Sequence, residues 1–376
     1  MLLLIPGPVN VPTSVLEYSK IVVNHRSEEF KKVVKELEDN LVKILGAERV
    51  GLLSGSGTLA VEAMVYSLTK RGQKVIGISY GDFGDRMIES MKRRGLKVVE
   101  LRKKMGEDIN LEEVKKVIDE NKDAELLALV HNETSTGIAL RNLREFVNIG
   151  KRNGLGVLVD SVSGMFAYEI LINKWKVDAV ASASQKALAS IPGLAIIAVS
   201  DEGLNRLNNY DVPTYLDLKL HLDFQIRNET PFTPNISAFY ATYRAVELLL
   251  LEGINRRIRR HESCSRLLRK ILEKFNFSLL GNENNFSNTV VAAFPYKYSP
   301  SELILKLREF NIEIAKGMGE LREKIVRFGV LGMIDYRALT YLKNSLEKIY
   351  DKKIDEIEIY GECKLPEELE KEVIWN

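Results

Sequence analysis

The chain has 376 residues, of which 45% are hydrophobic and 28% are charged. This composition is typical of a globular protein of about two domains, and it excludes a disordered or fibrous chain. Lysine and arginine total 54 against 52 aspartates and glutamates, so the net charge is +2, and neither sign forms a long block. We therefore expect no nucleic acid and no membrane among the binding partners.

Cysteine usage and the amino-terminal segment bear on the cellular compartment. Cys264 and Cys363 form no CxxC pair, and the chain has four histidines, so we expect neither a structural metal site nor a disulfide scaffold. The apolar residues 1–5 are stopped by Pro6-Gly7-Pro8, too early for the core of a signal peptide. No stretch approaches the roughly 18 apolar residues of a membrane span. The pattern predicts a soluble, reduced, cytoplasmic protein.

Short apolar runs alternate with amphipathic helical stretches over the first two-thirds of the chain. The runs predict strands at Lys74–Tyr80, Leu96–Leu101, Leu126–His131, Gly156–Ser161, Asp178–Ser184 and Leu194–Ser200. Helical spacing of apolar residues predicts helices at Thr58–Thr69, Asp85–Arg94, Leu111–Glu120 and Leu143–Asn153. Such alternation is typical of a parallel sheet that is buried between two layers of helices.

The pattern changes after Asp201. An irregular polar stretch, Asn208–Pro234, precedes a long helical pattern at Ser237–Phe275. Shorter signals follow it: strands at Thr289–Phe294, Ile312–Ala315 and Lys324–Leu331, and a helix at Ser301–Phe310. These elements predict a compact α+β second domain. We place an amino-terminal segment at 1–15, a large domain at 16–250 and a small domain at 251–376.

Residues just past the strands of an open parallel sheet are candidates for ligand binding. The first candidate is Ser54-Gly55-Ser56-Gly57-Thr58, which is followed by a helical pattern from Leu59. Small residues and the free N–H groups of a helix start suit a phosphate. An ordinary turn with a helix cap has the same composition, so both interpretations stay open here.

An acid and a lysine follow two other predicted strands. Asp160 ends a buried apolar run, where a carboxylate needs a cation or strong donors unless it caps the next turn. Lys186 lies among small and apolar residues, where burial would lower its pKa toward a reactive neutral amine. A lysine that extends to solvent is the alternative. Together, a phosphate cradle, a buried acid and a reactive amine are what pyridoxal 5'-phosphate requires.

These motifs resemble those of the class V aminotransferases, and within that family the sequence is similar to the alanine:glyoxylate and serine:pyruvate aminotransferases. The resemblance covers nearly the whole chain and is carried by Pro6-Gly7-Pro8, Asn24-His25-Arg26-Ser27, Ser54–Thr58, Gly81-Asp82-Phe83-Gly84, His131–Gly137, Val159–Ser163, Ser182–Leu188 and Arg327-Phe328-Gly329. It implies the α/β fold of the fold type I pyridoxal phosphate enzymes. That fold has a mostly parallel seven-stranded sheet between helices and a smaller α+β carboxyl-terminal domain.

The resemblance also implies how the cofactor is held. Lys186 would be the Schiff-base lysine, Asp160 would pair with the protonated ring nitrogen, and Phe83 would stack on the ring. Thr134, or the adjacent Ser135, would lie near the ring oxygen O3′. The phosphate would be bound by Ser56, Gly57, Thr58 and Gln185.

Substrate and subunit contacts follow from the same resemblance. Arg327 would bind the α-carboxylate of the substrate, since its planar fork matches two carboxylate oxygens. Thr230 and Thr233 fall in the region that reaches the phosphate of a partner subunit, which implies a homodimer with shared active sites. The mouth of the site would be formed by Pro8, His25 and Arg26.

The implied activity is ping-pong transamination from a small amino acid, serine or alanine, to a small 2-oxo acid, glyoxylate or pyruvate. Aspartate is an alternative donor if Arg26 or another cation reaches the pocket. A lyase similar to cysteine desulfurase would need a mobile nucleophilic cysteine, which neither Cys264 on a helical pattern nor Cys363 near the carboxyl end provides. A non-catalytic module that binds pyridoxal phosphate is the alternative from another class of protein.

Overall fold

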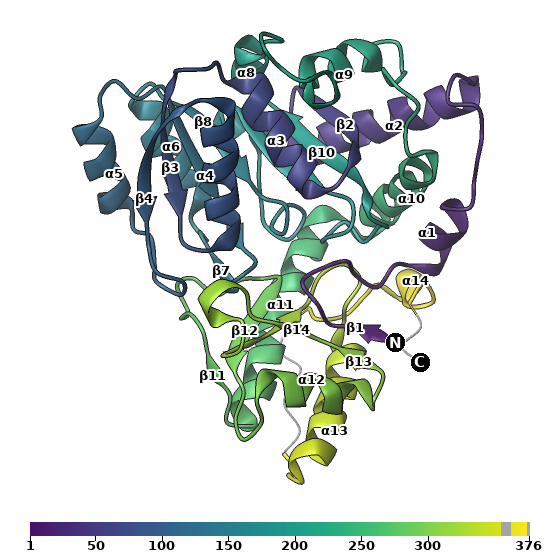
Figure 1. Cartoon of the computed structure of the whole chain (residues 1–376). Coiled ribbons are helices and arrows are strands. Elements are labelled where there is room, and N and C mark those ends of the chain that lie inside the picture. Colours follow the sequence, from purple (N-terminus) through teal and green to yellow (C-terminus); the bar gives the residue numbers. More distant parts are fainter. Residues whose placement is uncertain (355–361, 374–376) are drawn as a thin grey trace.

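A seven-stranded sheet forms the centre of the larger part of the molecule (Figure 1). The computed structural model describes residues 1–354 and 362–373. In spatial order the strands are β2 (Arg49–Gly55), β10 (Gly193–Val199), β9 (Ala179–Ala183), β8 (Gly156–Asp160), β5 (Leu126–Val130), β3 (Lys74–Ser79) and β4 (Lys97–Arg102). Both pairs that β10 forms, with β2 and with β9, are antiparallel, and the other pairs of this sheet are parallel. The predicted α/β fold with a mostly parallel seven-stranded sheet is confirmed.

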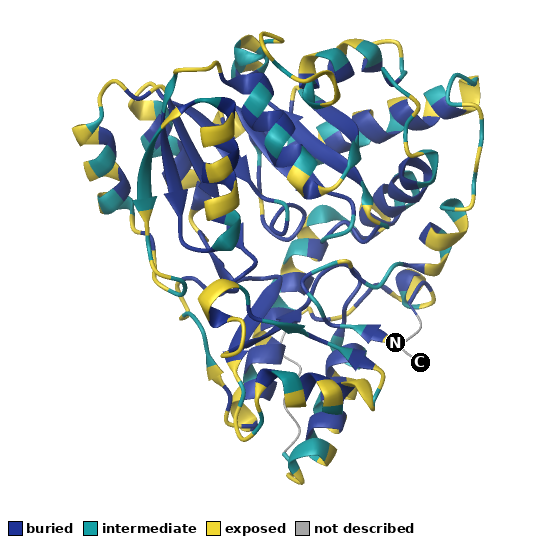
Figure 2. Cartoon of the chain, in the orientation of Figure 1, coloured by how far each residue is buried: buried dark blue, intermediate teal, exposed yellow. Residues whose placement is uncertain are grey.

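Helices cover both faces of this sheet. Alternate residues of each strand point to opposite faces, so Val157 and Val159 join one apolar cluster while Leu158 joins the other. The first cluster includes side chains of α2 (Glu28–Leu45), α5 (Leu111–Glu120), α6 (Leu143–Arg152) and α10 (Ile236–Glu252). The second includes side chains of α3 (Gly57–Leu68), α4 (Asp82–Arg94) and α9 (Leu218–Gln225). Burial on both faces explains the nearly continuous apolar runs of the central strands (Figure 2).

Some elements of the structure were not predicted, and some predicted elements are wrong. The strand β2 has no counterpart among the predicted strands, because its sequence starts with Arg49 and ends in the small residues of the proposed phosphate loop. The predicted long helix at 237–275 is two helices, α10 and α11 (Ile254–Lys274), which are separated by Gly253 with a φ of 80°. The stretch expected to be irregular, 208–234, contains α9.

The smaller part of the molecule is built on an antiparallel sheet of β11 (Ser278–Leu279), β12 (Val290–Phe294), β15 (Val326–Gly329) and β14 (Ala315–Lys316). Its apolar cluster includes side chains of α11, α12 (Pro300–Arg308) and α13 (Tyr336–Tyr350). The amino-terminal strand β1 (Leu2–Leu3) pairs with β13 (Ile312–Glu313), so residues that begin the chain lie against this part. Within the described ranges, no helix has both the length and the apolar character needed to cross a membrane.

The remaining helices are short. They are α1 (Thr13–Tyr18), α7 (Ile172–Trp175), α8 (Asp201–Arg206), α14 (Glu367–Glu370) and two 3₁₀ turns at Thr214–Leu216 and Gly319–Leu321. A further pair of short strands, β6 (Asn132–Glu133) and β7 (Ile138–Ala139), follows β5.

The two cysteines are joined, so the prediction of a reduced chain is wrong. Cys264 of α11 and Cys363 form a disulfide with Cα atoms 4.8 Å apart, and both residues are buried. The carboxyl-terminal segment contacts the start of α13 at this point, where Tyr336 N donates to Cys363 O at 2.9 Å. The two cysteines are separated by 99 residues, and no pattern in the sequence indicates that they pair.

Replacing both cysteines by alanine is expected to destabilise the protein without removing activity. The disulfide closes a loop across a sequence separation of 99 residues, and its loss should lower the free energy of unfolding by about 2–4 kcal/mol. Thermal unfolding of the wild type and of the Cys264→Ala/Cys363→Ala variant measures this difference. If titration finds two free thiols in the denatured, unreduced wild-type protein, the disulfide is absent and the prediction is contradicted.

Candidate active site

Two adjoining cavities lie where the parallel strands of the large sheet end. The first has a volume of about 780 Å³ and the second about 670 Å³, and they share Phe83, Thr134, Lys186 and Met318 in their linings. Many of the predicted cofactor residues line the first cavity: Ser56, Gly57, Thr58, Phe83, Thr134, Asp160, Gln185 and Lys186. The predicted substrate residue Arg327 lines the second cavity. Residues from distant parts of the sequence therefore meet at one place.

Lys186 follows β9 and lies in the wall between the two cavities. Its Nζ donates a hydrogen bond to Pro6 O. The pKa of this amine is lowered to about 8, mainly by burial and also by the charge of Arg327, while Asp160 opposes both effects. A Cβ atom on Gly7, whose φ is +113°, would lie 2.6 Å from the amine, so the amino-terminal segment can approach the lysine only with glycine there. The lowered pKa of Lys186 has the direction that the sequence predicted for a more reactive amine.

Asp160 is the last residue of β8 and is buried. Its Oδ1 accepts a hydrogen bond from Val162 N at 2.9 Å, so the carboxylate does cap the turn after its strand. Burial raises the pKa of Asp160 to about 7, and the negative charge of Glu133 acts in the same direction. Asp160 lines the first cavity, and no donor in the described part of the chain bonds its second oxygen. That oxygen is therefore available to a ligand.

The loop between β2 and α3 has the features of an anion site. Ser56 is the residue before α3, and its side chain makes no capping hydrogen bond, so the first N–H groups of this helix lack a side-chain acceptor. The partial positive charge of a helix start favours an anion. A Cβ atom on Gly57 would lie 2.5 Å from Val162 Cγ1, which shows how closely the loop packs on the segment after Asp160. Gln185 Oε1 lies in the same cavity, buried and without a hydrogen-bond partner.

The structure separates the two candidates for the O3′ contact. Thr134 lines both cavities, and its Oγ1 lies 2.6 Å from Ser163 Oγ. Ser135 lines neither cavity; its hydroxyl donates to Glu133 Oε1 at 2.6 Å and accepts from Asp82 N at 3.1 Å. Of the two hydroxyls, that of Thr134 is therefore the one at the cavity wall.

Arg327 of β15 brings a cation from the smaller part of the molecule to the site. Its Nε donates to Lys316 O at 2.7 Å and its Nη1 donates to Thr134 O at 3.0 Å. Nη2 makes no hydrogen bond to the described part of the chain. Burial lowers the pKa of Arg327 to about 10, while the charges of Asp82 and Glu133 raise it. The guanidinium remains charged near neutral pH and keeps a donor for a ligand.

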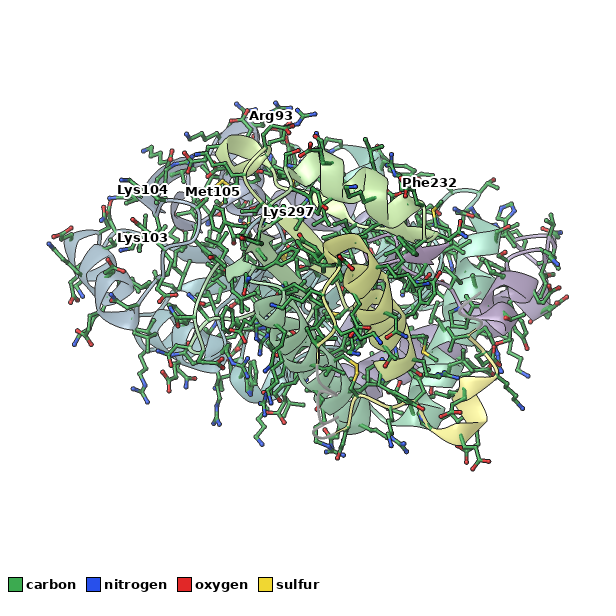
Figure 3. All side chains as sticks on the ribbon, turned by 90° about the horizontal axis from the view of Figure 1, so that it is seen from below. Arg93, Lys103, Lys104, Met105, Phe232 and Lys297 are labelled. Carbon is green, nitrogen blue, oxygen red and sulfur yellow. A yellow bond between two sulfur atoms is a disulfide. The ribbon has the colours of Figure 1, made fainter. Side chains whose placement is uncertain are left out.

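Besides Ser135, five predicted residues line neither cavity of the single chain: Pro8, His25, Arg26, Thr230 and Thr233. Arg26 Nη1 lies 3.0 Å from Glu229 Oε2, so the segments that carry the last four residues are neighbours. Thr230 and Thr233 line a separate small cavity together with Phe232. In the view from below, Phe232 lies apart from Arg93, which lines the first large cavity (Figure 3). Pro8 directly follows Gly7, which lines the second cavity, and the small cavity of Thr230 and Thr233 is also lined by Ser54 of β2, the strand before α3.

Several cavity residues were not predicted. Asn132, Val162, Ser163 and Met318 line the first cavity. The first three follow the ends of β5 and β8, so their position after a strand is a signal that could have identified them. Met318 comes from a turn of the smaller part of the molecule, and no pattern in its sequence indicates a place at the cavity.

Residues 15–334 match the family model of the class V aminotransferases. The chain belongs to this family, and its structural neighbours are pyridoxal phosphate-dependent aminotransferases of fold type I. An uncharacterized aminotransferase of Methanocaldococcus jannaschii is 34% identical over 88% of this chain and 88% of its own length.

Two solved structures are similar to this fold. The aspartate aminotransferase of subgroup IV from Thermus thermophilus has a TM-score of 0.87 and 30% identity, covering 93% of this chain and 99% of its own. The alanine–glyoxylate aminotransferase from a Nostoc species has a TM-score of 0.85 and 29% identity, covering 93% of this chain and 94% of its own.

Proposed function

We propose that this aminotransferase uses pyridoxal 5'-phosphate and transfers the amino group of serine or alanine to glyoxylate or pyruvate in a ping-pong reaction. The observation that carries the proposal is the meeting of Lys186, Asp160 and the start of α3 in one cavity, with Arg327 in the adjoining one. In a ping-pong reaction the amino acid and the 2-oxo acid bind in turn, so one site serves both half-reactions.

The residues of the first cavity fit the cofactor. The amine of Lys186 would hold the aldehyde, and the free oxygen of Asp160 would face the ring nitrogen. The first N–H groups of α3 would hold the phosphate, and the side-chain amide of Gln185, whose Oε1 has no partner, can turn to donate to it. When bound, pyridoxal phosphate supplies an electron sink for the bonds at the substrate Cα.

The chain itself supplies charge and proton transfer. An amine with a pKa near 8 carries a proton part of the time near neutral pH, so Lys186 Nζ can both accept and donate one. Arg327 would bind the substrate carboxylate, because its Nη2 is free and its other nitrogens are fixed by Lys316 O and Thr134 O. A negative charge on Asp160 would stabilise a protonated ring nitrogen.

The lining of the second cavity supports an amino donor with a small, uncharged side chain. Two cations in its lining are already paired: Arg308 with Glu313 at 2.7 Å, and Lys316 with Glu323 at 2.9 Å. Each of these cations therefore already has an acidic partner from the chain itself.

Aspartate is the second candidate donor. It is supported by the similarity to the Thermus aspartate aminotransferase and by Arg86, whose guanidinium lines the first cavity 4.8 Å from the centroid of the Phe83 ring. If aspartate is the donor and Arg86 binds its side chain, Arg86→Met should reduce kcat/KM for aspartate and leave kcat/KM for alanine unchanged.

The desulfurase alternative has no support at the site. Neither cysteine lines either cavity, and both are held in the buried disulfide. Activity that survives the double alanine replacement would separate transamination from cysteine-dependent chemistry.

We also propose a homodimer in which each chain completes the site of the other. The segments that carry His25, Arg26, Thr230 and Thr233 are neighbours, and these residues line neither large cavity of their own chain, as residues that serve a partner would. Light scattering should give twice the mass of one chain. Thr233→Ala should weaken binding of pyridoxal phosphate without changing that mass, whereas a monomer with normal affinity would contradict the dimer.

The absorbance spectrum of the purified protein with pyridoxal phosphate tests the activity. We expect a visible band that shifts when L-alanine or L-serine is added and returns when glyoxylate is added. A panel of donors including aspartate, scored by kcat/KM with each acceptor, ranks the substrates. A protein that binds the cofactor and responds to no amino acid would instead be a non-catalytic binding module.

Arg327→Lys is expected to raise KM for the amino donor by roughly 10- to 100-fold, because a lysine cannot form two parallel hydrogen bonds with a carboxylate. Steady-state kinetics with varied alanine measures the change, and cofactor affinity serves as the control. An unchanged KM would show that the carboxylate binds elsewhere.

The pH dependence of cofactor uptake follows from Lys186. Only the neutral amine attacks an aldehyde, and the pKa of about 8 places its deprotonation near that pH instead of near 10.5. The rate at which the cofactor-free protein incorporates pyridoxal phosphate should therefore rise with pH and level off just above pH 8. A rate that keeps rising to pH 10 would contradict the lowered pKa.

A further inference from the structure

Glu133 is a buried carboxylate beside the cofactor cavity that has no part in the function proposed above. It lies in β6, and its side chain accepts hydrogen bonds from backbone and hydroxyl groups only. Gly84 N donates to Oε2 at 3.0 Å and Phe83 N at 3.2 Å, while Ser135 N and Ser135 Oγ donate to Oε1 at 3.0 and 2.6 Å. The carboxylate therefore joins the start of α4 to the segment after β5.

This contact replaces a helix cap that α4 cannot provide. The residue before α4 is Gly81, which has no side chain to accept from the first N–H groups of the helix. Instead Ser135 Oγ accepts from Asp82 N at 3.1 Å, and Glu133 accepts from Phe83 N and Gly84 N, the next two groups. A negative charge at a helix start is also favoured by the helix dipole.

The close approach depends on glycine at position 81. A Cβ atom there would lie 2.5 Å from Glu133 Cδ and 2.5 Å from Ser135 Oγ. No real side chain tolerates such distances, so any other residue would push the carboxylate away from the helix. The hydrogen bonds from the start of α4 to Glu133 therefore require glycine at position 81.

The capped turn carries the aromatic ring of the site. Phe83 is the second residue of α4, its backbone N–H is one of the groups that Glu133 binds, and its ring lines both cavities. A fixed backbone at this residue fixes where the ring stands over the cavity.

We propose that Glu133 is a positioning residue that sets Phe83 for stacking on the cofactor ring, an inference that rests on the proposed function. Glu133 lines neither of the two cavities. It acts through the two N–H groups at the start of α4, and Ser135 supports it at the preceding residue.

A double-mutant cycle on the cofactor-free protein tests this role. The wild type, Glu133→Gln, Phe83→Leu and the double variant are each titrated with pyridoxal phosphate, without amino acid, so that substrate binding at Arg327 does not contribute. The amide of Glu133→Gln keeps the shape but has one acceptor fewer. We expect each single variant to raise Kd about tenfold, and the double variant to match Phe83→Leu alone because the two act through one ring.

Controls separate positioning from general damage. Glu38→Gln replaces another buried carboxylate, one that pairs with Arg49 and lines neither cavity, and it should leave Kd unchanged. If Glu133→Gln does not fold, the same cycle is run with Ser135→Ala. This change removes the acceptor for Asp82 N and the hydroxyl that donates to Glu133 Oε1, and it should raise Kd by about threefold. That increase should also vanish when Phe83 is leucine.

The possible outcomes are distinct. Independent effects that multiply in the double variant, or an unchanged Kd in Glu133→Gln, overturn the positioning role while leaving the proposed function intact. A wild-type protein that binds no pyridoxal phosphate overturns the proposed function and this inference with it.

Discussion

Replacing Lys186 by alanine is expected to reduce the rate of transamination by at least about 10⁴-fold, the upper range for loss of a general acid and base. The variant loses the amine that would bond to the cofactor aldehyde, and it loses the group at the cavity wall that can move a proton. Its neighbours are not expected to substitute, since Arg327 remains protonated near neutral pH with a pKa of about 10.

The measurement is the single-turnover rate with alanine as donor at saturating pyridoxal phosphate. Lys174→Ala, on an exposed residue of α7, is the matched control and should retain full activity. A Lys186→Ala rate within tenfold of the wild type would show that another amine performs the chemistry.

Asp160→Asn is expected to reduce kcat by about 10²–10³-fold, the range observed when one preorganised electrostatic group is removed from a site. An asparagine has the same shape, and its oxygen can still accept from Val162 N, so the turn after β8 should be preserved. What is lost is the negative charge that would stabilise a protonated ring nitrogen, and affinity for the cofactor should change less than kcat.

Steady-state kinetics and a cofactor titration of the same preparation separate these two effects. Asp119→Asn on α5, where the native carboxylate pairs with Lys122 at the surface, serves as the control. If Asp160→Asn lowers affinity strongly but leaves kcat unchanged, the carboxylate has a structural role only.

The fold was largely predictable because its central strands are buried on both faces and consist of nearly continuous apolar residues. The strand β2 escaped prediction because Gly55 and its small neighbours also suit a loop. The break at Gly253 was missed since a single glycine within a helical pattern does not by itself show where the backbone turns.

Parts of the site were predictable for a different reason. Asp160 ends one strand of the large sheet and Lys186 follows the neighbouring strand, and ligands bind where the carboxyl ends of parallel strands meet. Arg327 lies on another sheet, and its place depends on how the two parts of the chain pack, which periodicity does not encode. The pairing of Cys264 with Cys363 and the cap formed by Glu133 are long-range contacts of the same kind.

Reduction with borohydride followed by peptide mapping tests the central claim most directly, because it fixes the cofactor to whichever amine has bonded with it. The account predicts one modified peptide per chain, labelled at Lys186. Label on a different lysine, or no label in a protein saturated with pyridoxal phosphate, would contradict it.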